Sequence, residues 1–299
     1  MKLTLAPVQY YWPRERLTEF YAEVAEAPVD TVYLGEQVCS RRHEMRLEDW
    51  LGLGELLAAR GKEVVLSAQA LLESEGDLKL LRNLIANGRF RVEANDMSAV
   101  RLLAGQPGWV AGPHLNVYNP QTLQLLAELG ATRWVAPVEI THDALAGVAA
   151  ARPPGVEIEV SGYGRLPLAF SARCFTARHF NLQKENCGTR CIEFPDGLAL
   201  ATGEGMPFLT LNGIQIQSAR VYWLLHELPA LHRLGAGALR ASAHADNMPQ
   251  ALALLLACCD GSIGADEALR ALAPLMPDAP CDGFWHGRPG LEQSFSRAA

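Results

Sequence analysis

The sequence predicts an α/β fold: a (β/α)8 TIM-barrel-like parallel barrel with an inserted cysteine-rich loop and a helical C-terminal segment. Short apolar stretches of strand length alternate with segments of helical period along most of the chain. About eight or nine such strands over roughly 240 residues favour closure into a barrel over an open doubly wound sheet. No G-x-G-x-x-G follows the first strand, which removes the main reason to expect a dinucleotide-binding fold.

The predicted strands are short runs rich in branched apolar and aromatic residues. They span residues 2–8, 31–35, 63–69, 89–94, 109–116, 132–137, 156–164 and 208–213, with 237–242 as a further candidate. The predicted helices place apolar residues three and four positions apart, and they span residues 16–27, 46–61, 95–105, 119–131 and 141–155. Asn95 or Asp96 is the expected N-cap of the third helix, and Gly61 and Gly105 are expected to end two others.

The alternation of strands and helices fails once, after the strand at 156–164, where some forty residues show no clear period. Loops this long are uncommon in compact domains and are usually functional. We therefore predict a barrel over residues 1–243, with a cysteine-rich loop at about 165–207 inserted in it. Two helical segments and a Pro/Gly-rich tail then predict that residues 244–299 form a helical extension packed on the barrel.

The composition excludes several classes of partner. The chain has 299 residues and a formal net charge of −7, so nothing indicates binding to nucleic acid or to an anionic membrane. The N-terminal apolar run is too short for a signal peptide, and the longest apolar run, at 251–259, is half of a membrane span, so no transmembrane segment is expected. The chain is predicted to be cytoplasmic. There its seven cysteines stay reduced, and a disulfide framework is not expected.

Three of the cysteines, Cys174, Cys187 and Cys191, lie in the irregular segment at spacing C-x12-C-x3-C. Cys39 follows the strand at 31–35 by a few residues, and in a parallel barrel both loops lie at the C-terminal ends of strands. Cys39 is therefore available to complete a set of four. Cys281 remains the main alternative for the fourth position, whereas Cys258 and Cys259 lie in an apolar helix, where buried free cysteine is common.

Four thiols at this spacing favour a 4Fe-4S cluster over zinc. Structural zinc sites usually contain close C-x2-C pairs, which are absent from these four positions, whereas a larger cluster suits irregular spacing. Basic residues in the loop would favour thiolates and offset an anionic cluster; they are Arg173, Arg178, Lys184 and Arg190. Gly188 lets the backbone wrap closely. A zinc site and ordinary unliganded thiols remain open as alternatives.

The chain also resembles a known family. The stretches LPLAFSARCFTARHFNLQKENCGTRC at 166–191 and YLGEQVCSRRHE at 33–44 carry the resemblance, which is to the collagenase-like (U-type) peptidases. The N-terminal MKLTLAPVQYYWPRE and LTLNGIQIQSA at 209–219 fit the same family. One departure concerns proteolysis: where relatives carry a histidine and a cysteine near HGALC, this chain has SGYGRLPL, so peptidase activity is not expected.

The resemblance implies more than the spacing does. It implies a 4Fe-4S cluster held by Cys39, Cys174, Cys187 and Cys191, and a UbiU-like homologous protein as partner in a heterodimer. The implied role is that of a subunit of a complex for oxygen-independent ring hydroxylation during anaerobic ubiquinone biosynthesis. Prephenate is the implied oxygen donor, and a sterol-carrier-like protein is implied to present the lipid intermediate.

Other residues are candidates without an assigned catalytic role. His114, Asn116 and Glu93 follow predicted strands on the same face and are candidates for substrate binding. Glu36 precedes Cys39 and could support the cluster or act as a general base. Two other function classes stay open: a zinc-stabilised noncatalytic scaffold subunit, and a family-related hydrolase or RNA-modifying enzyme.

Overall fold

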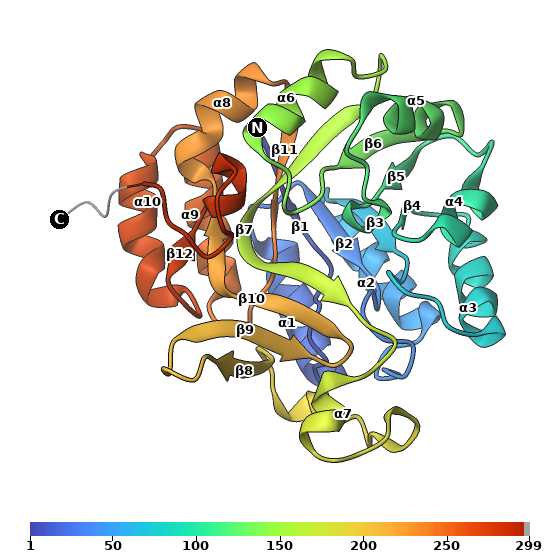
Figure 1. Ribbon diagram of the computed structural model, residues 1–299. Coiled ribbons are helices and arrows are strands. Elements are labelled where there is room, and N and C mark those ends of the chain that lie inside the picture. The colour runs from blue at the N-terminus through green and yellow to red at the C-terminus, as the bar shows by residue number, and fades with distance from the viewer. Residues whose placement is uncertain (296–299) are drawn as a thin grey trace.

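The computed structural model describes residues 1–295 and contains a closed barrel of eight parallel strands (Figure 1). The barrel strands are β1 (Lys2–Leu5), β2 (Thr31–Leu34), β3 (Glu63–Ser67), β4 (Arg91–Ala94), β5 (Trp109–Ala111), β6 (Ala131–Val135), β7 (Glu157–Phe170) and β11 (Ala236–Ala241). β11 pairs in parallel with both β1 and β7, which closes the barrel. The predicted TIM-barrel-like fold class is confirmed.

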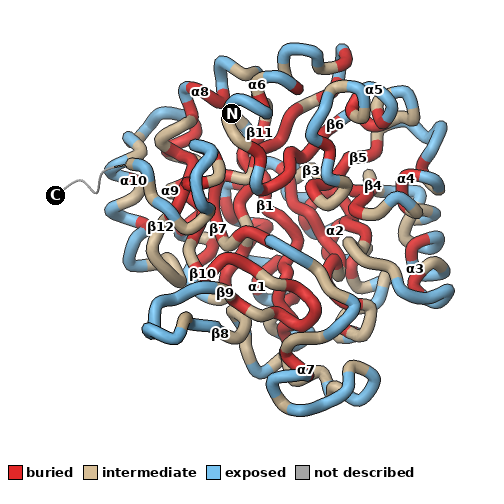
Figure 2. Tube along the Cα trace, in the orientation of Figure 1, coloured by how far each residue is buried: buried red, intermediate tan, exposed pale blue. Residues whose placement is uncertain are grey.

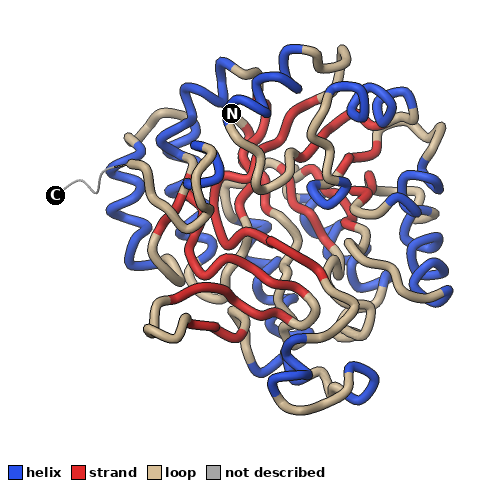
Figure 3. Tube along the Cα trace, viewed as in Figure 1, coloured by secondary structure: helices blue, strands red, loops and turns tan. Residues whose placement is uncertain are grey.

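Helices surround this barrel, as Figure 3 shows. They are α1 (Arg14–Glu26), α2 (Leu47–Ala59), α3 (Glu75–Ile85), α4 (Met97–Leu103), α5 (Pro120–Glu128), α6 (His142–Ala150) and α8 (Leu228–Arg233). The α1 helix buries Leu17 and Phe20, as its period predicts. Asp96, one of the two candidates, is the N-cap of α4, because its side chain accepts a hydrogen bond from the Ser98 amide.

The strand expectations need two corrections. The strand expected at 109–116 ends at Ala111, because Pro113 begins a 3-10 turn over Pro113–Leu115. The strand expected at 208–213 is β9 (Pro207–Asn212), but it lies outside the barrel. Its place next to β7 in the barrel is taken by β11.

The segment inserted after β7 contains more regular structure than its sequence indicates. β7 continues to Phe170 and pairs with the antiparallel β10 (Gln215–Trp223), which pairs in turn with β9, and β9 with β8 (Leu198–Ala201). Between β7 and β8 lies α7 (Phe175–His179) at the lower edge of the molecule in Figure 2; its Thr176 and Ala177 are buried, while most of the loop that follows it is exposed or partly exposed. This projecting segment carries the three clustered cysteines.

The C-terminal part of the described chain packs on the barrel. It contains α9 (Met248–Cys259), α10 (Ala265–Leu272) and β12 (Pro280–Cys281), the last of which pairs with β10. Leu252, Leu255 and Leu272 of these helices join the main hydrophobic core. Among the described residues, no helix has both the length and the apolar character needed to cross a membrane.

The interior of the barrel is filled partly by ion pairs rather than by apolar side chains alone. Arg133 is almost fully buried, and its guanidinium donates to Glu63 Oε2 and to Glu157 Oε2, both at 2.7 Å. Burial alone would raise the pKa of Glu63, but hydrogen bonds and charge from Arg133 lower it to about 2. These ionised groups join β3, β6 and β7 at the N-terminal ends of the strands.

Candidate metal centre

The segment 171–196 is held at both ends by hydrogen bonds to distant parts of the chain. At its start, the Ser171 amide donates to the Ile214 carbonyl at 2.9 Å. At its end, Trp12 Nε1 donates to the Pro195 carbonyl at 2.7 Å. Because Trp12 is fully buried in the core, the second contact joins the segment to the rigid barrel.

Two cysteines from distant parts of the sequence meet beside this segment. Cys39, in the loop after β2, lies in a small apolar cluster with Val38 and Ile214, and Cys174 packs against the same cluster. Cys174 is the N-cap of α7, and its sulfur accepts a hydrogen bond from the Ala177 amide at 3.4 Å. Burial raises the pKa of the Cys39 thiol to about 11, and a negative charge on Cys174 would raise it further.

Arg42 is a buried cation beside these thiols. Its guanidinium donates to the Gln9 carbonyl and to Asn212 Oδ1, both at 2.7 Å. Its Nε is buried and has no hydrogen-bond partner among the described residues. Burial raises the pKa of the Cys191 thiol, and the Arg42 charge is the largest opposing effect; the same charge also opposes the rise at Cys39. The site therefore contains positive charge that would stabilise thiolates.

Glu36 shapes the turn that presents Cys39. Its Oε1 accepts hydrogen bonds from the Val38 amide at 2.9 Å and the Cys39 amide at 3.0 Å, and Arg42 Nη1 lies 3.5 Å away. Burial raises the pKa of the Glu36 carboxyl, while Arg42 and these amides oppose the rise. Of the two roles considered for Glu36, this geometry favours support of the cysteine loop over proton transfer.

Cys187 is half-buried, and its sulfur accepts a hydrogen bond from the Thr189 amide at 3.4 Å. It precedes Gly188 and Thr189, which both have positive φ values, of 56° and 50°. In the part of the chain that the structure describes, no three Cys, His, Asp or Glu side chains are grouped closely enough to hold a metal ion as they stand. The donor chemistry nevertheless fits a sulfur-ligated group, because Cys39 and Cys174 share one apolar cluster and the Arg42 charge opposes the rise in the pKa of both Cys39 and Cys191. Binding such a group would require the loop to close around it.

The remaining cysteines lie elsewhere. Cys258 and Cys259 are buried in α9. Cys281, the alternative fourth ligand, is fully buried in β12, and the charged groups that influence it are Arg220, Asp282 and Asp278. The charged residues near Cys281 therefore differ from those near Cys39 and Cys191, both of which Arg42 influences.

Two of the loop cations expected to favour thiolates are engaged in other contacts. Lys184 forms an ion pair with Glu73, and its Nζ also donates to the Ala172 carbonyl at 2.9 Å. Arg190 pairs with Glu193 at 3.0 Å, and its guanidinium carbon lies 4.5 Å from the centre of the Phe180 ring. Arg42 was not among the residues predicted from the sequence, although its position three residues after Cys39 was a usable signal.

At the mouth of the barrel, Glu93 is fully buried and ionised. Its Oε1 accepts from Arg240 Nη1 at 2.7 Å, and its Oε2 accepts from Ser67 and from Asn95 Nδ2, the latter at 3.1 Å. Burial would raise the pKa of Glu93, but Arg240 and these donors lower it. Asn95 Oδ1 is left without a partner among the described residues.

His114 lies close enough to Glu93 for their charges to interact, but Asn116 does not share its environment. The His114 ring centre lies 4.8 Å from that of Phe170, and its Nε2 is buried with no partner in the described chain. Burial lowers the pKa of His114 to about 4, so the ring is neutral at neutral pH. Asn116 is exposed and ends the 3-10 turn with a φ of 54°.

A cluster of buried amide side chains, which was not predicted from the sequence, lies between the barrel mouth and Arg42. Gln9 Oε1 accepts from Gln217 Nε2 at 2.8 Å and from Gln215 Nε2 at 3.2 Å. Gln37 Nε2 donates to Ser67 at 3.2 Å. Gln215 and Gln217 share one face of β10, so the alternation QIQ was the available signal. The buried side chains of these glutamines therefore occupy space at the mouth of the barrel.

The comparison with known proteins identifies the family. The family model described as peptidase family U32 matches residues 15–196, and this span includes Cys39, Cys174, Cys187 and Cys191. The chain belongs to peptidase family U32. This confirms the U-type peptidase resemblance at the level of the family.

Solved structures resemble this U32 family member only at low identity. The U32 peptidase Mk0906 is 12% identical, with a TM-score of 0.46, covering 81% of this chain and 93% of that one. The spore cortex-lytic enzyme SleL of Bacillus megaterium QM B1551 is 10% identical, with a TM-score of 0.44, covering 86% of this chain and 73% of the enzyme. A dihydropteroate synthase of Burkholderia cenocepacia is 13% identical, with a TM-score of 0.40, covering 92% and 94%.

Proposed function

We propose that this U32 family member is a UbiV-type protein that binds a 4Fe-4S cluster through Cys39, Cys174, Cys187 and Cys191. The observation that carries the proposal is that Cys39 and Cys174 share one apolar cluster, while the buried Arg42 guanidinium influences both Cys39 and Cys191. Such a cluster accepts and donates single electrons when bound. Four protein thiolates leave no open iron position, which favours electron transfer or a structural role over direct chemistry at iron.

This chain's own residues have defined roles in the proposal. Glu36 accepts hydrogen bonds from the Val38 and Cys39 amides and so fixes the backbone at Cys39. At the end of the loop, Trp12 donates to the Pro195 carbonyl, and Arg165 Nη1 donates to the Asp196 carbonyl at 2.6 Å. Arg42 offsets the negative charge of the thiolates from within the protein. Together these contacts position the ligands and keep one side of the site away from water.

The wider role in the proposal is oxygen-independent ring hydroxylation during anaerobic ubiquinone biosynthesis in the cytoplasm. The chain would act in a heterodimer with a UbiU-like protein, with a sterol-carrier-like protein presenting the lipid and prephenate supplying oxygen. A hydrolase role is less favoured, because β7 carries SGYGRLPL at 161–168 where peptidase-like relatives have a histidine and a cysteine.

The decisive experiment is anaerobic purification followed by an absorption spectrum and iron and sulfide counts. The expected result is a brown protein with about four irons and four sulfides per chain. The Cys174→Ala variant is expected to lose the colour, while the matched variant Cys258→Ala, in buried helix α9, keeps it. A colourless wild-type protein with one zinc per chain would overturn the redox proposal and support the scaffold alternative.

A further inference from the structure

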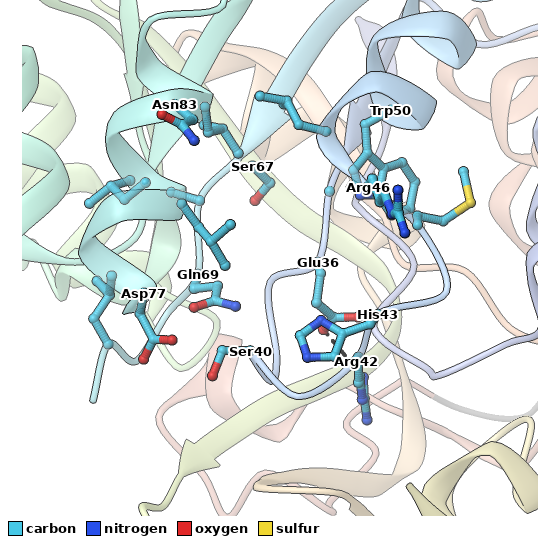
Figure 4. A pocket seen from close by; sticks show the side chains of 18 of the residues that line it. Glu36, Ser40, Arg42, His43, Arg46, Trp50, Ser67, Gln69, Asp77 and Asn83 are labelled. Carbon is cyan, nitrogen blue, oxygen red and sulfur yellow. Dashed lines mark hydrogen bonds and ion pairs between the residues drawn. The ribbon is translucent and has the colours of Figure 1, made fainter. Parts of the chain in front are cut away.

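A cavity of about 520 Å³ lies between α2 and α3, beneath the loops that follow β2 and β3 (Figure 4). This volume is in the range of small-molecule binding pockets, which is about 300–1,000 Å³. A helix is about 10 Å across with its side chains, so a partner helix would need an open groove rather than a cavity of this size. The position and volume of the cavity therefore suit one small molecule.

Most of the cavity wall is apolar. Trp50 of α2 and Leu81 of α3 are buried, while Leu80 of α3 is 54% exposed, and all three line the cavity. The apolar lining residues are Met45, Leu47, Trp50, Leu72, Leu80, Leu81 and Leu84. Burying an apolar ligand against this wall would remove both surfaces from water, which is the main source of affinity in such pockets.

One group of polar side chains lies on the loops that follow β2 and β3, whereas Asn83 lies on α3 at the upper end of the cavity in Figure 4. Figure 4 shows Ser40, His43 and Gln69 around the lower part of the cavity, with Arg46 beside Trp50. None of these four side chains forms a hydrogen bond or an ion pair with another described residue. They are therefore free to donate hydrogen bonds to a ligand.

The carboxylates in the lining are mostly engaged within the protein. Glu36 accepts from the Val38 and Cys39 amides, and Asp77 accepts from the Glu73 and Ser74 amides. Glu48 is exposed in the first turn of α2, where the helix dipole offsets its charge. Of the unused polar side chains, Arg46 can only donate hydrogen bonds, while Ser40, His43 and Gln69 can both donate and accept them.

We propose that this cavity binds a small aromatic or aliphatic molecule whose polar end carries hydrogen-bond acceptors and lies against Ser40, His43 and Arg46. The proposal goes beyond the cluster function and does not depend on it, because no cysteine lines the cavity. It does place the polar end of the ligand on the loop that presents Cys39.

The test uses two fluorescent probes that share one apolar body. 1-Anilinonaphthalene-8-sulfonate carries an acceptor group, and N-phenyl-1-naphthylamine lacks it. Titration of the full-length protein is expected to show saturable binding of about one molecule of each probe, with the sulfonate bound about fivefold more tightly, the size expected for an exposed charged contact. Equal affinity for the two probes would contradict the acceptor end, and no saturable binding would overturn the cavity proposal.

Two variants with matched controls locate the bound probe. Leu80→Glu is expected to weaken both probes about tenfold, while Leu125→Glu, at an equally exposed leucine on α5 (52% against 54%), leaves them unchanged. Arg46→Gln is expected to abolish the preference for the sulfonate, while Arg101→Gln on α4 does not. Unchanged binding in Leu80→Glu would overturn the proposal. In Cys174→Ala, where the cluster is expected to be lost, both probes should still bind.

Discussion

At the residue scale, Arg42 has the most consequential environment in the molecule. It joins the β1–α1 loop through Gln9, the turn before Cys39 through Glu36, and the inserted sheet through Asn212. Removing a buried cation that has several partners strongly destabilises a protein. The partners then stay buried without the hydrogen-bond donor and the positive charge that they had. We therefore expect Arg42 both to fix the position of the Cys39 turn and to stabilise the folded protein.

We expect Arg42→Met to lower the free energy of unfolding by about 3 kcal/mol, measured by urea unfolding. In a Glu36→Gln background the same substitution should lose about 1 kcal/mol less, because the buried carboxylate is no longer left unpaired. Arg101→Met, at an exposed position of α4, is the control and should change stability little. Equal losses in both backgrounds would show that the Arg42–Glu36 contact has no energetic importance.

At the element scale, α3 is one of the helices that were not predicted from the sequence, although its start carries a clear signal. Ser74 is the N-cap and accepts from the Asp77 amide at 3.2 Å, while Asp77 accepts in return from the Ser74 amide at 3.1 Å. This reciprocal pair is a capping box. The helix it begins forms one wall of the cavity beside Cys39.

We expect Ser74→Ala to destabilise the protein by about 1 kcal/mol, because the orphan amide of Asp77 loses its acceptor. Ser98→Ala is a matched control in the first turn of α4, since the Ser98 hydroxyl makes no hydrogen bond with another described residue. Urea unfolding of the two variants gives the comparison. A loss for Ser98→Ala as large as that for Ser74→Ala would argue against a specific cap.

Elements with a strong local period were the predictable part of the fold. The α1 face and the short barrel strands follow from spacing alone. The inserted sheet could not be predicted in the same way, because β8, β9 and β10 pair with one another and with the extension of β7 rather than with barrel neighbours. Their register depends on tertiary contacts such as Gln217 with Gln9, which no local pattern contains.

In the candidate site, too, some features could be predicted from the sequence pattern and others depend on tertiary contacts. Loop topology was enough to predict that Cys39 and the 171–191 loop share one face. The buried Arg42 and the amide cluster of Gln9 and Gln37 depend on which side chains the fold brings inward. Burial and partners decide their roles, and neither is visible in residue spacing.

At the scale of the whole molecule, the charged interior of the barrel determines how stability depends on pH. The pKa of Glu63 in the folded protein is about 2, below its usual value of 4.5, so its contribution is present above about pH 4.5 and is lost as the pH falls through about 2. With an allowance for solvent screening, that contribution is about 1–2 kcal/mol.

We therefore expect Glu63→Gln to be about 1–2 kcal/mol less stable than the wild-type protein at pH 7, and the difference to shrink as the pH falls from about 4.5 toward 2. Urea unfolding at several pH values measures it. Glu55→Gln, which breaks the exposed pair with Arg89, is the control and should change stability by less than about 0.5 kcal/mol. A Glu63→Gln difference that is constant over this pH range would contradict the assigned pKa.

The tethering of segment 171–196 at Ser171 and Pro195 has a consequence for assembly. A closed loop keeps its thiols near Cys39 at a high effective concentration, in the millimolar range for short flexible connections. In the proposed cluster-binding role, part of the entropy of bringing the ligands together would thus be lost during folding, and the closing of the loop would account for the rest. Each further bond from a captured ion to this loop would then be an intramolecular step, and its binding energy would appear as added rigidity of the projecting segment.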